Sequence, residues 1–180
     1  MHEKGIHMRP EAGSKRGFAV RPLSPDRVDE AYPVVRAAMP DLSLERWRDF
    51  ASRAVGEPAV SPPPGIMLVE SAQGYIYGLC AYRLQHDIRH GRVLVIEELV
   101  TLGLVDGASV AATLIAALEE RARELGCAAM NLNMSDSFPP RPSCSALRDL
   151  LTRNGHCVDG VRLLKRIDRP EGQPPTVLRR

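Results

Sequence analysis

Two adjacent glutamates, Glu97 and Glu98, interrupt the otherwise apolar run VLVIEELV. An ionised carboxylate is costly inside a strand unless it is paired or solvated, so this placement favours a cleft, where a carboxylate can accept a proton. Because successive residues of a strand point to opposite faces, we expect one of the two to face the cleft, with Glu98 the first choice and Glu97 the second. The alternative is a salt bridge to Arg83 or Arg92.

A turn of small residues, VDGASV at residues 105–110, follows this run and precedes a long amphipathic segment. A helix that starts here leaves backbone N–H groups unpaired at the positive end of its dipole, and such an end binds phosphate. Asp106 or Ser109 could instead cap the helix and occupy the same N–H groups. In that alternative the segment binds no ligand.

The segment HDIRH places two histidines, His86 and His90, four residues apart. On a helix they would share a face and could hold zinc. Here they fall in a short connection, residues 85–91, between two predicted strands, and no third ligand is evident. We therefore expect no metal, and a solvated loop is the favoured interpretation of both side chains.

Helix signals surround these residues. Ser24 and Pro25 predict a helix start, while Pro33 should kink or break that helix. Ser43 is expected to cap a second helix, and Gly126 is expected to end the long one. The second helix has apolar residues at helical spacing, namely Leu44, Trp47, Phe50, Ala51 and Ala54. The long helix has a buried stripe of Val110, Leu114, Leu118, Ala122 and Leu125.

Strands are predicted at residues 18–23, 66–70, 75–84, 93–102, 128–134 and 161–167. Residues 138–143 are expected to form a proline-broken loop, and residues 145–153 a helix ended by Gly155. The order is strand, two helices, three strands, then helix and strand twice. It predicts a mixed α/β (α+β) sheet, in which an antiparallel meander is followed by a parallel crossover.

This order of elements resembles that of the GCN5-related N-acetyltransferases, the GNAT superfamily, over residues 18–167. In that family the turn before the main helix reads Gln or Arg, two residues, Gly, one residue, then Gly or Ala. The matching positions here hold Asp106, Ser109 and Ala111, and Ala111 fits the pattern. The resemblance implies an N-acetyltransferase that moves an acetyl group from acetyl-CoA to a primary amine of a small molecule or peptide by direct attack.

The resemblance also implies roles for particular residues. Glu98, or else Glu97, would be the base, and His86 and His90 would lie near the acceptor. Cofactor contacts would come from Leu99, Val100, Thr101, Asp106, Gly107, Ala108, Ser109, Val110, Ala111, Ala112 and Asn133.

One functional position departs from the family. The usual acid is a tyrosine four residues before the glycine that ends the penultimate helix, and with Gly155 as that glycine the position holds Leu151. Water or another group, such as Ser143, Cys144 or Ser145, would then protonate the leaving thiolate. Asp106 and Leu151 keep an alternative open, namely a catalytically silent GNAT-fold domain that binds a ligand or partner protein. A hydrolase built on the histidine pair is a third interpretation.

The 180 residues suit one domain, residues 18–167, between flexible tails at 1–17 and 168–180. A net charge of +2 from scattered Lys and Arg does not indicate that the protein binds nucleic acid.

No apolar run in the sequence approaches the roughly 18 residues that a membrane span needs. The four cysteines show no metal or disulfide spacing, which favours reduced thiols in the cytoplasm. A homodimer, the commonest soluble assembly, is left open.

Overall fold

The structure, a computed structural model, describes residues 17–55, 64–102, 107–133 and 142–160, with the backbone alone for residues 142–146. Its helices and strands follow the predicted order. They are β1 (Phe18–Pro22), the 3₁₀ helix η1 (Pro25–Arg27), α1 (Val28–Ala38), α2 (Leu44–Val55), β2 (Gly65–Ser71), β3 (Ile76–Asp87), β4 (Gly91–Thr101), α3 (Gly107–Glu124), β5 (Ala129–Leu132) and α4 (Pro142–Arg153). The predictions for residues 1–16, for the strand 161–167 and for the tail 168–180 lie outside the described residues.

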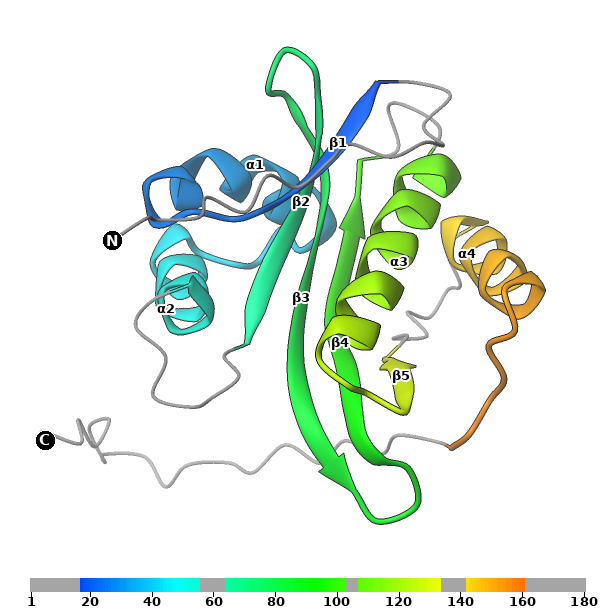
Figure 1. Ribbon diagram of the computed structural model, residues 1–180. Coiled ribbons are helices and arrows are strands. Elements are labelled where there is room, and N and C mark those ends of the chain that lie inside the picture. The colour runs from blue at the N-terminus through cyan, green and yellow to red at the C-terminus, as the bar shows by residue number, and fades with distance from the viewer. Residues whose placement is uncertain (1–16, 56–63, 103–106, 134–141, 161–180) are drawn as a thin grey trace, which may run out of the picture.

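The described strands form one mixed sheet in the order β1-β2-β3-β4-β5. The first four pair antiparallel, and β5 lies parallel to β4 after the crossover through α3. This confirms the predicted meander and crossover. The helices α1 and α2 cover one face of the sheet, while α3 covers the other with α4 beside it (Figure 1). No helix in the described ranges is both long and apolar enough to cross a membrane.

The sheet therefore separates two apolar cores. Trp47 and Ala51 of α2 pack with α1 on one side, where the indole N–H of Trp47 donates to the Val28 carbonyl at 2.7 Å. On the other side α3 buries the predicted stripe against the sheet, through Val110, Leu114, Leu118 and Ala122. Leu125 packs against that core while partly buried.

Local signals account for several helix ends. The Ser43 hydroxyl accepts from the Arg46 N–H at 3.3 Å at the start of α2, as predicted. Gly126, at φ +66°, ends α3 in the left-handed conformation that glycine adopts without steric cost. Pro33, however, does not break α1. The helix loses one N–H donor there, but Ala31, Val34 and Val35 hold the turns on either side in the core.

The structure differs from the prediction at the boundaries of β3, β4 and α4. β3 and β4 extend to a tight hairpin, because the Asp87 carboxylate accepts from the N–H groups of Arg89 at 2.8 Å and His90 at 3.0 Å. These N–H donors lower the pKa of Asp87. α4 begins at Pro142 rather than at residue 145, because proline suits the first turn of a helix, where its missing N–H has no partner to lose.

Gly78 lets β3 pass close beneath the first turn of α3. A Cβ at this position would lie 2.8 Å from the Val100 carbonyl oxygen and 2.8 Å from Cγ1 of Val110. Real Cβ atoms essentially never come so close, so any larger residue would push α3 away from β4. The glycine thus fixes the start of α3 beside the end of β4.

We therefore predict that Gly78→Ala lowers the free energy of unfolding by about 1–3 kcal/mol, the cost of overpacking a core. Urea denaturation followed by circular dichroism measures it. Gly17→Ala is the matched control, because nothing lies within 4 Å of a Cβ there. Equal stability of the two variants would contradict this account of Gly78.

Candidate active site

A β-bulge in β4 determines where its two glutamates point. In the register with β3, Ala81 lies opposite Glu98 and Tyr82 lies opposite Ile96, so Glu97 is an extra residue on β4. The expectation that the adjacent acids face opposite sides is therefore wrong, because the extra residue interrupts the alternation of side chains. Glu97 and Glu98 both line one pocket.

This pocket has a volume of about 540 Å³ and lies on the side of the sheet that α2 covers. Its walls come from α2, β3, β4 and the end of β5. The lining residues are Phe50, Arg83, Gln85, Val95, Glu97, Glu98, Asn131 and Asn133. The carboxylates and amide groups make it a strongly polar pocket, in the size range of about 300–1,000 Å³ that is typical of small-ligand sites.

One of the two carboxylates is held by an arginine. Nε of Arg83 donates to Glu97 at 2.7 Å, and another N–H of the same guanidinium donates to the Gln85 side-chain oxygen at 2.9 Å. The salt bridge that the sequence offered as an alternative is thus present for Glu97, and it lies within the pocket. Arg92 instead donates to the Leu125 carbonyl. The Glu98 side chain is exposed to solvent.

β4 continues beyond the end of β5. Their pairing runs from Val93 with Ala129 to Ile96 with Leu132, and the Asn133 N–H still donates to the Ile96 carbonyl at 3.3 Å. β4 then extends to Thr101 without β5 beside it. Beyond Ile96, the β5-facing edge of β4 thus has no strand partner among the described residues.

The direction of the peptide groups along this edge follows from one hydrogen bond. The Leu102 N–H donates to the Tyr77 carbonyl of β3 at 2.8 Å. Peptide groups alternate in direction along a strand, so Val100 also faces β3, whereas Leu99 and Thr101 turn their N–H and C=O groups to the open side. Leu99, Val100 and Thr101 are the three residues of β4 whose backbone is predicted to contact the cofactor. Leu99 and Thr101 turn their peptide groups to the edge that no described strand covers, whereas Val100 turns its peptide groups to β3.

The start of α3 lies directly against the end of β4. A Cβ on Gly107 would lie 3.3 Å from Oγ1 of Thr101. No acidic residue stands in the first turn of α3 as described. The N–H groups of Gly107, Ala108 and Ser109 belong to that turn. The N–H groups of Val110, Ala111 and Ala112 belong to the next turn of α3. N–H groups at such positions of a helix donate to carbonyl groups of the preceding turn. Asp106 lies outside the described residues.

The remaining candidates are not brought to the pocket. Leu151 is buried in α4 at 5% exposure and has no proton to donate. The side chains of Ser143, Cys144 and Ser145 lie outside the described residues. His86 is exposed on β3, and Nε2 of His90 lies 3.6 Å from the Asp159 carboxylate. Neither histidine lines the pocket. Among the described side chains, no three potential metal ligands gather.

Cys80, on β3, is also not a nucleophile, because burial raises the pKa of its thiol to about 12. Of the residues that line the pocket, Phe50, Gln85, Val95 and Asn131 have no role in the sequence-based prediction of the site, whereas Asn133 is there a predicted cofactor contact. The pairs Arg83 with Gln85 and Asn131 with Asn133 each show a spacing of two residues, which places both members on one face of a strand. Phe50, expected in the core, is 38% exposed and stacks on Trp47 with 6.1 Å between ring centroids. It forms a wall of the pocket instead.

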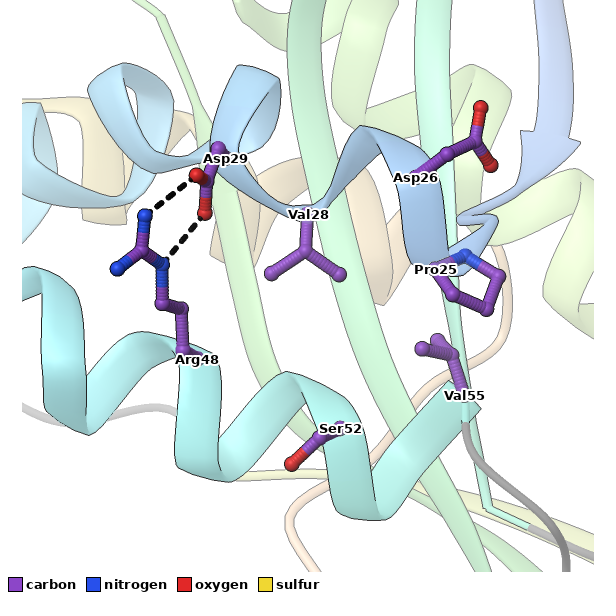
Figure 2. A pocket seen from close by; sticks show the side chains of 7 residues that line it. All are labelled: Pro25, Asp26, Val28, Asp29, Arg48, Ser52 and Val55. Atoms are coloured by element: carbon purple, nitrogen blue, oxygen red, sulfur yellow. Dashed lines mark hydrogen bonds and ion pairs between the residues drawn. The ribbon is translucent and has the colours of Figure 1, made fainter.

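A second, smaller hollow of about 360 Å³ lies between α1 and α2. Figure 2 shows Val28, Pro25 and Val55 along it, with Asp29 and Arg48 facing each other across one end. Two hydrogen bonds, of 2.8 and 2.6 Å, join that pair and lower the pKa of Asp29. This hollow is mostly apolar and lies away from the glutamates. Its ion pair links the two helices.

The sequence matches no protein-family model and no curated protein. The structure is nevertheless similar to solved acetyltransferases. A ribosomal-protein-alanine N-acetyltransferase from Brucella melitensis biovar Abortus 2308 matches with a TM-score of 0.63 and 17% identity, over 84% of this chain and 99% of that one. The aminoglycoside N-acetyltransferase AAC(6′)-Iy in complex with CoA matches with a TM-score of 0.66 and 14% identity, over 91% and 100%.

A third neighbour is glucosamine-6-phosphate N-acetyltransferase from Arabidopsis thaliana, with a TM-score of 0.62 and 14% identity over 84% of this chain and 99% of that one. The three proteins are named for different acceptors, and what they share with this chain is the arrangement of the sheet and its helices. The chain therefore has the fold of the GCN5-related N-acetyltransferases.

Proposed function

We propose that this protein is an N-acetyltransferase that uses acetyl-CoA to acetylate a primary amine. The observation that carries the proposal is the continuation of β4 beyond β5. It leaves the peptide groups of Leu99 and Thr101 on an edge that no described strand covers, next to the polar pocket of Glu97 and Glu98.

The edge of β4 suits the pantetheine arm of the donor. That arm contains two amides, which can pair with peptide groups of an open edge as an added strand does. The N–H groups of residues 107–109 lie at the positive end of α3, which suits the diphosphate of the same molecule. The close approach of Gly107 to Thr101 brings these two binding elements together.

The reaction needs a base and a path for one further proton. Acetyl-CoA supplies an acetyl group activated as a thioester. Glu98, exposed in the pocket, takes the proton from the attacking amine as the N–C bond forms and the C–S bond breaks. Leu151 cannot protonate the leaving thiolate, so water does so.

Leu151 also favours a second candidate, a catalytically silent domain of the same fold that binds a ligand or partner protein. That leucine is buried in α4 and its side chain has no proton to donate, so we expect no acid at this position. The silent domain and the enzyme differ in donor binding and in turnover, and both can be measured.

Acetyl-CoA should raise the melting temperature by several degrees, because a ligand at 100 times its dissociation constant stabilises the native state by about 2.7 kcal/mol. Differential scanning fluorimetry measures the shift, with an equal concentration of AMP as the control that lacks the pantetheine arm. No shift at millimolar acetyl-CoA would contradict donor binding and favour the silent domain.

Glu98→Gln should slow the release of CoA thiol from acetyl-CoA in the presence of a free primary amine that the wild type acetylates, by about 10²-fold, the lower range for loss of a general base. The melting shift with acetyl-CoA should stay unchanged. Glu120→Gln, on the exposed face of α3, is the matched control and should keep the wild-type rate. A wild-type rate in Glu98→Gln would remove this residue from the mechanism.

A further inference from the structure

One row of residues crosses the sheet at the floor of the polar pocket. Val95 of β4 pairs with Arg83 of β3 on one side and with Asn131 of β5 on the other, and all three side chains line the pocket. Neighbouring strands lie about 4.8 Å apart, so Arg83 and Asn131 flank a buried apolar side chain. The floor of the pocket is therefore apolar in its centre and polar on two opposite sides.

The guanidinium of Arg83 is held in place and still has N–H groups to offer. Its Nε donates to Glu97 at 2.7 Å, and a second N–H donates to the Gln85 side-chain oxygen at 2.9 Å. A guanidinium carries five N–H groups, so three remain, and none of the three donates to a residue in the described ranges. Because Glu97 offsets its charge, Arg83 offers a ligand hydrogen-bond donors rather than net charge.

Asn131 offers an acceptor and donors from the opposite side. Its side-chain oxygen accepts and its NH₂ group donates, and neither bonds to another residue in the part of the chain that the structure describes. Phe50 of α2 adds an apolar wall to the pocket. A flat group suits this lining if it accepts on one side, donates on the other and has a plane that can lie on Val95. An amide has this pattern.

We propose that the acceptor is a small primary amine that also carries an uncharged amide, such as an amino-acid amide, and that Arg83 and Asn131 recognise this amide. This inference rests on the proposed function. Arg83 donates to the carbonyl oxygen of the acceptor amide, and the Asn131 side-chain oxygen accepts from its N–H. Glu97 positions the guanidinium.

Three primary amines of one shape test the proposal. They are 3-aminopropanamide, 3-methylbutylamine and 3-aminopropanoate, which end in an amide, an isopropyl group and a carboxylate. Release of CoA thiol gives kcat/KM for each, expressed per unprotonated amine. We expect the amide to exceed the isopropyl probe by about tenfold, as for one hydrogen bond to a charged group. It should also exceed the carboxylate, which has no N–H for Asn131.

Two variants assign the preference to its residues. Arg83→Met combined with Glu97→Gln removes the ion pair as a unit, so neither charge is left without its partner. The ratio of kcat/KM between amide and isopropyl probes should then fall about tenfold, with the change in KM. Asn131→Leu keeps the ion pair and should lower the ratio about fivefold, as for a hydrogen bond between neutral groups.

Intrinsic reactivities of the two amines cancel when the ratio is compared between variant and wild type. Arg123→Gln, which breaks an exposed ion pair on α3, is the matched control and should leave the ratio unchanged. Both test variants should keep the melting shift with acetyl-CoA, which shows that they fold and bind the donor.

The outcomes separate the two proposals. An unchanged ratio in either test variant, with CoA released, would overturn recognition of the amide by Arg83 and Asn131 and leave the acetyltransferase standing. So would wild-type protein that acetylates the isopropyl or carboxylate probe as fast as the amide, or that binds acetyl-CoA and releases no CoA with the amide probe. Absence of both the melting shift and CoA release would overturn the proposed function and this inference together.

Discussion

The candidate site depends on how β4 pairs with its two neighbours. Beside β3 it carries one residue too many, which turns Glu97 and Glu98 to the same side of the sheet. Beside β5 it is too long, which leaves the peptide groups of Leu99 and Thr101 without a strand partner in the part of the chain that the structure describes. Without the bulge, Glu97 and Glu98 would point to opposite faces of the sheet. A longer β5 would cover more of the edge of β4. The irregularities of one strand therefore create both the polar pocket and the open backbone next to it.

The rest of the fold holds β4 between two cores. α3 is pressed against the sheet where Gly78 leaves room for Val110, and this fixes the helix start relative to the strand end. On the opposite face α2 places Phe50 at the pocket through its packing with α1. Farther away, the buried carboxylate of Glu70 pairs with Arg21 at 2.8 Å and Arg27 at 2.6 Å. That network joins β1, β2 and η1 at the edge of the sheet.

Much of the fold could be predicted from local chemistry. The Ser43 cap, the glycine after α3 and the apolar stripe of α3 each follow from interactions within a few residues, and the structure confirms them. The site was less predictable. The bulge at Glu97 depends on the register with β3, a partner that the residues of β4 do not reveal. Pro33 stays helical because of distant packing, and Phe50 lies at a pocket because of where α2 meets the sheet. The roles of the site residues remain proposals.

The pairing of β4 with a donor can be tested most directly at single amides. Hydrogen exchange of the ¹⁵N-labelled protein, recorded with and without acetyl-CoA, reports whether each N–H gains a partner. We expect slower exchange at Leu99 and Thr101 and in the first turn of α3, with no change at Ile88 in the β3–β4 hairpin. Unchanged exchange at Leu99 and Thr101 in the presence of bound acetyl-CoA would contradict it.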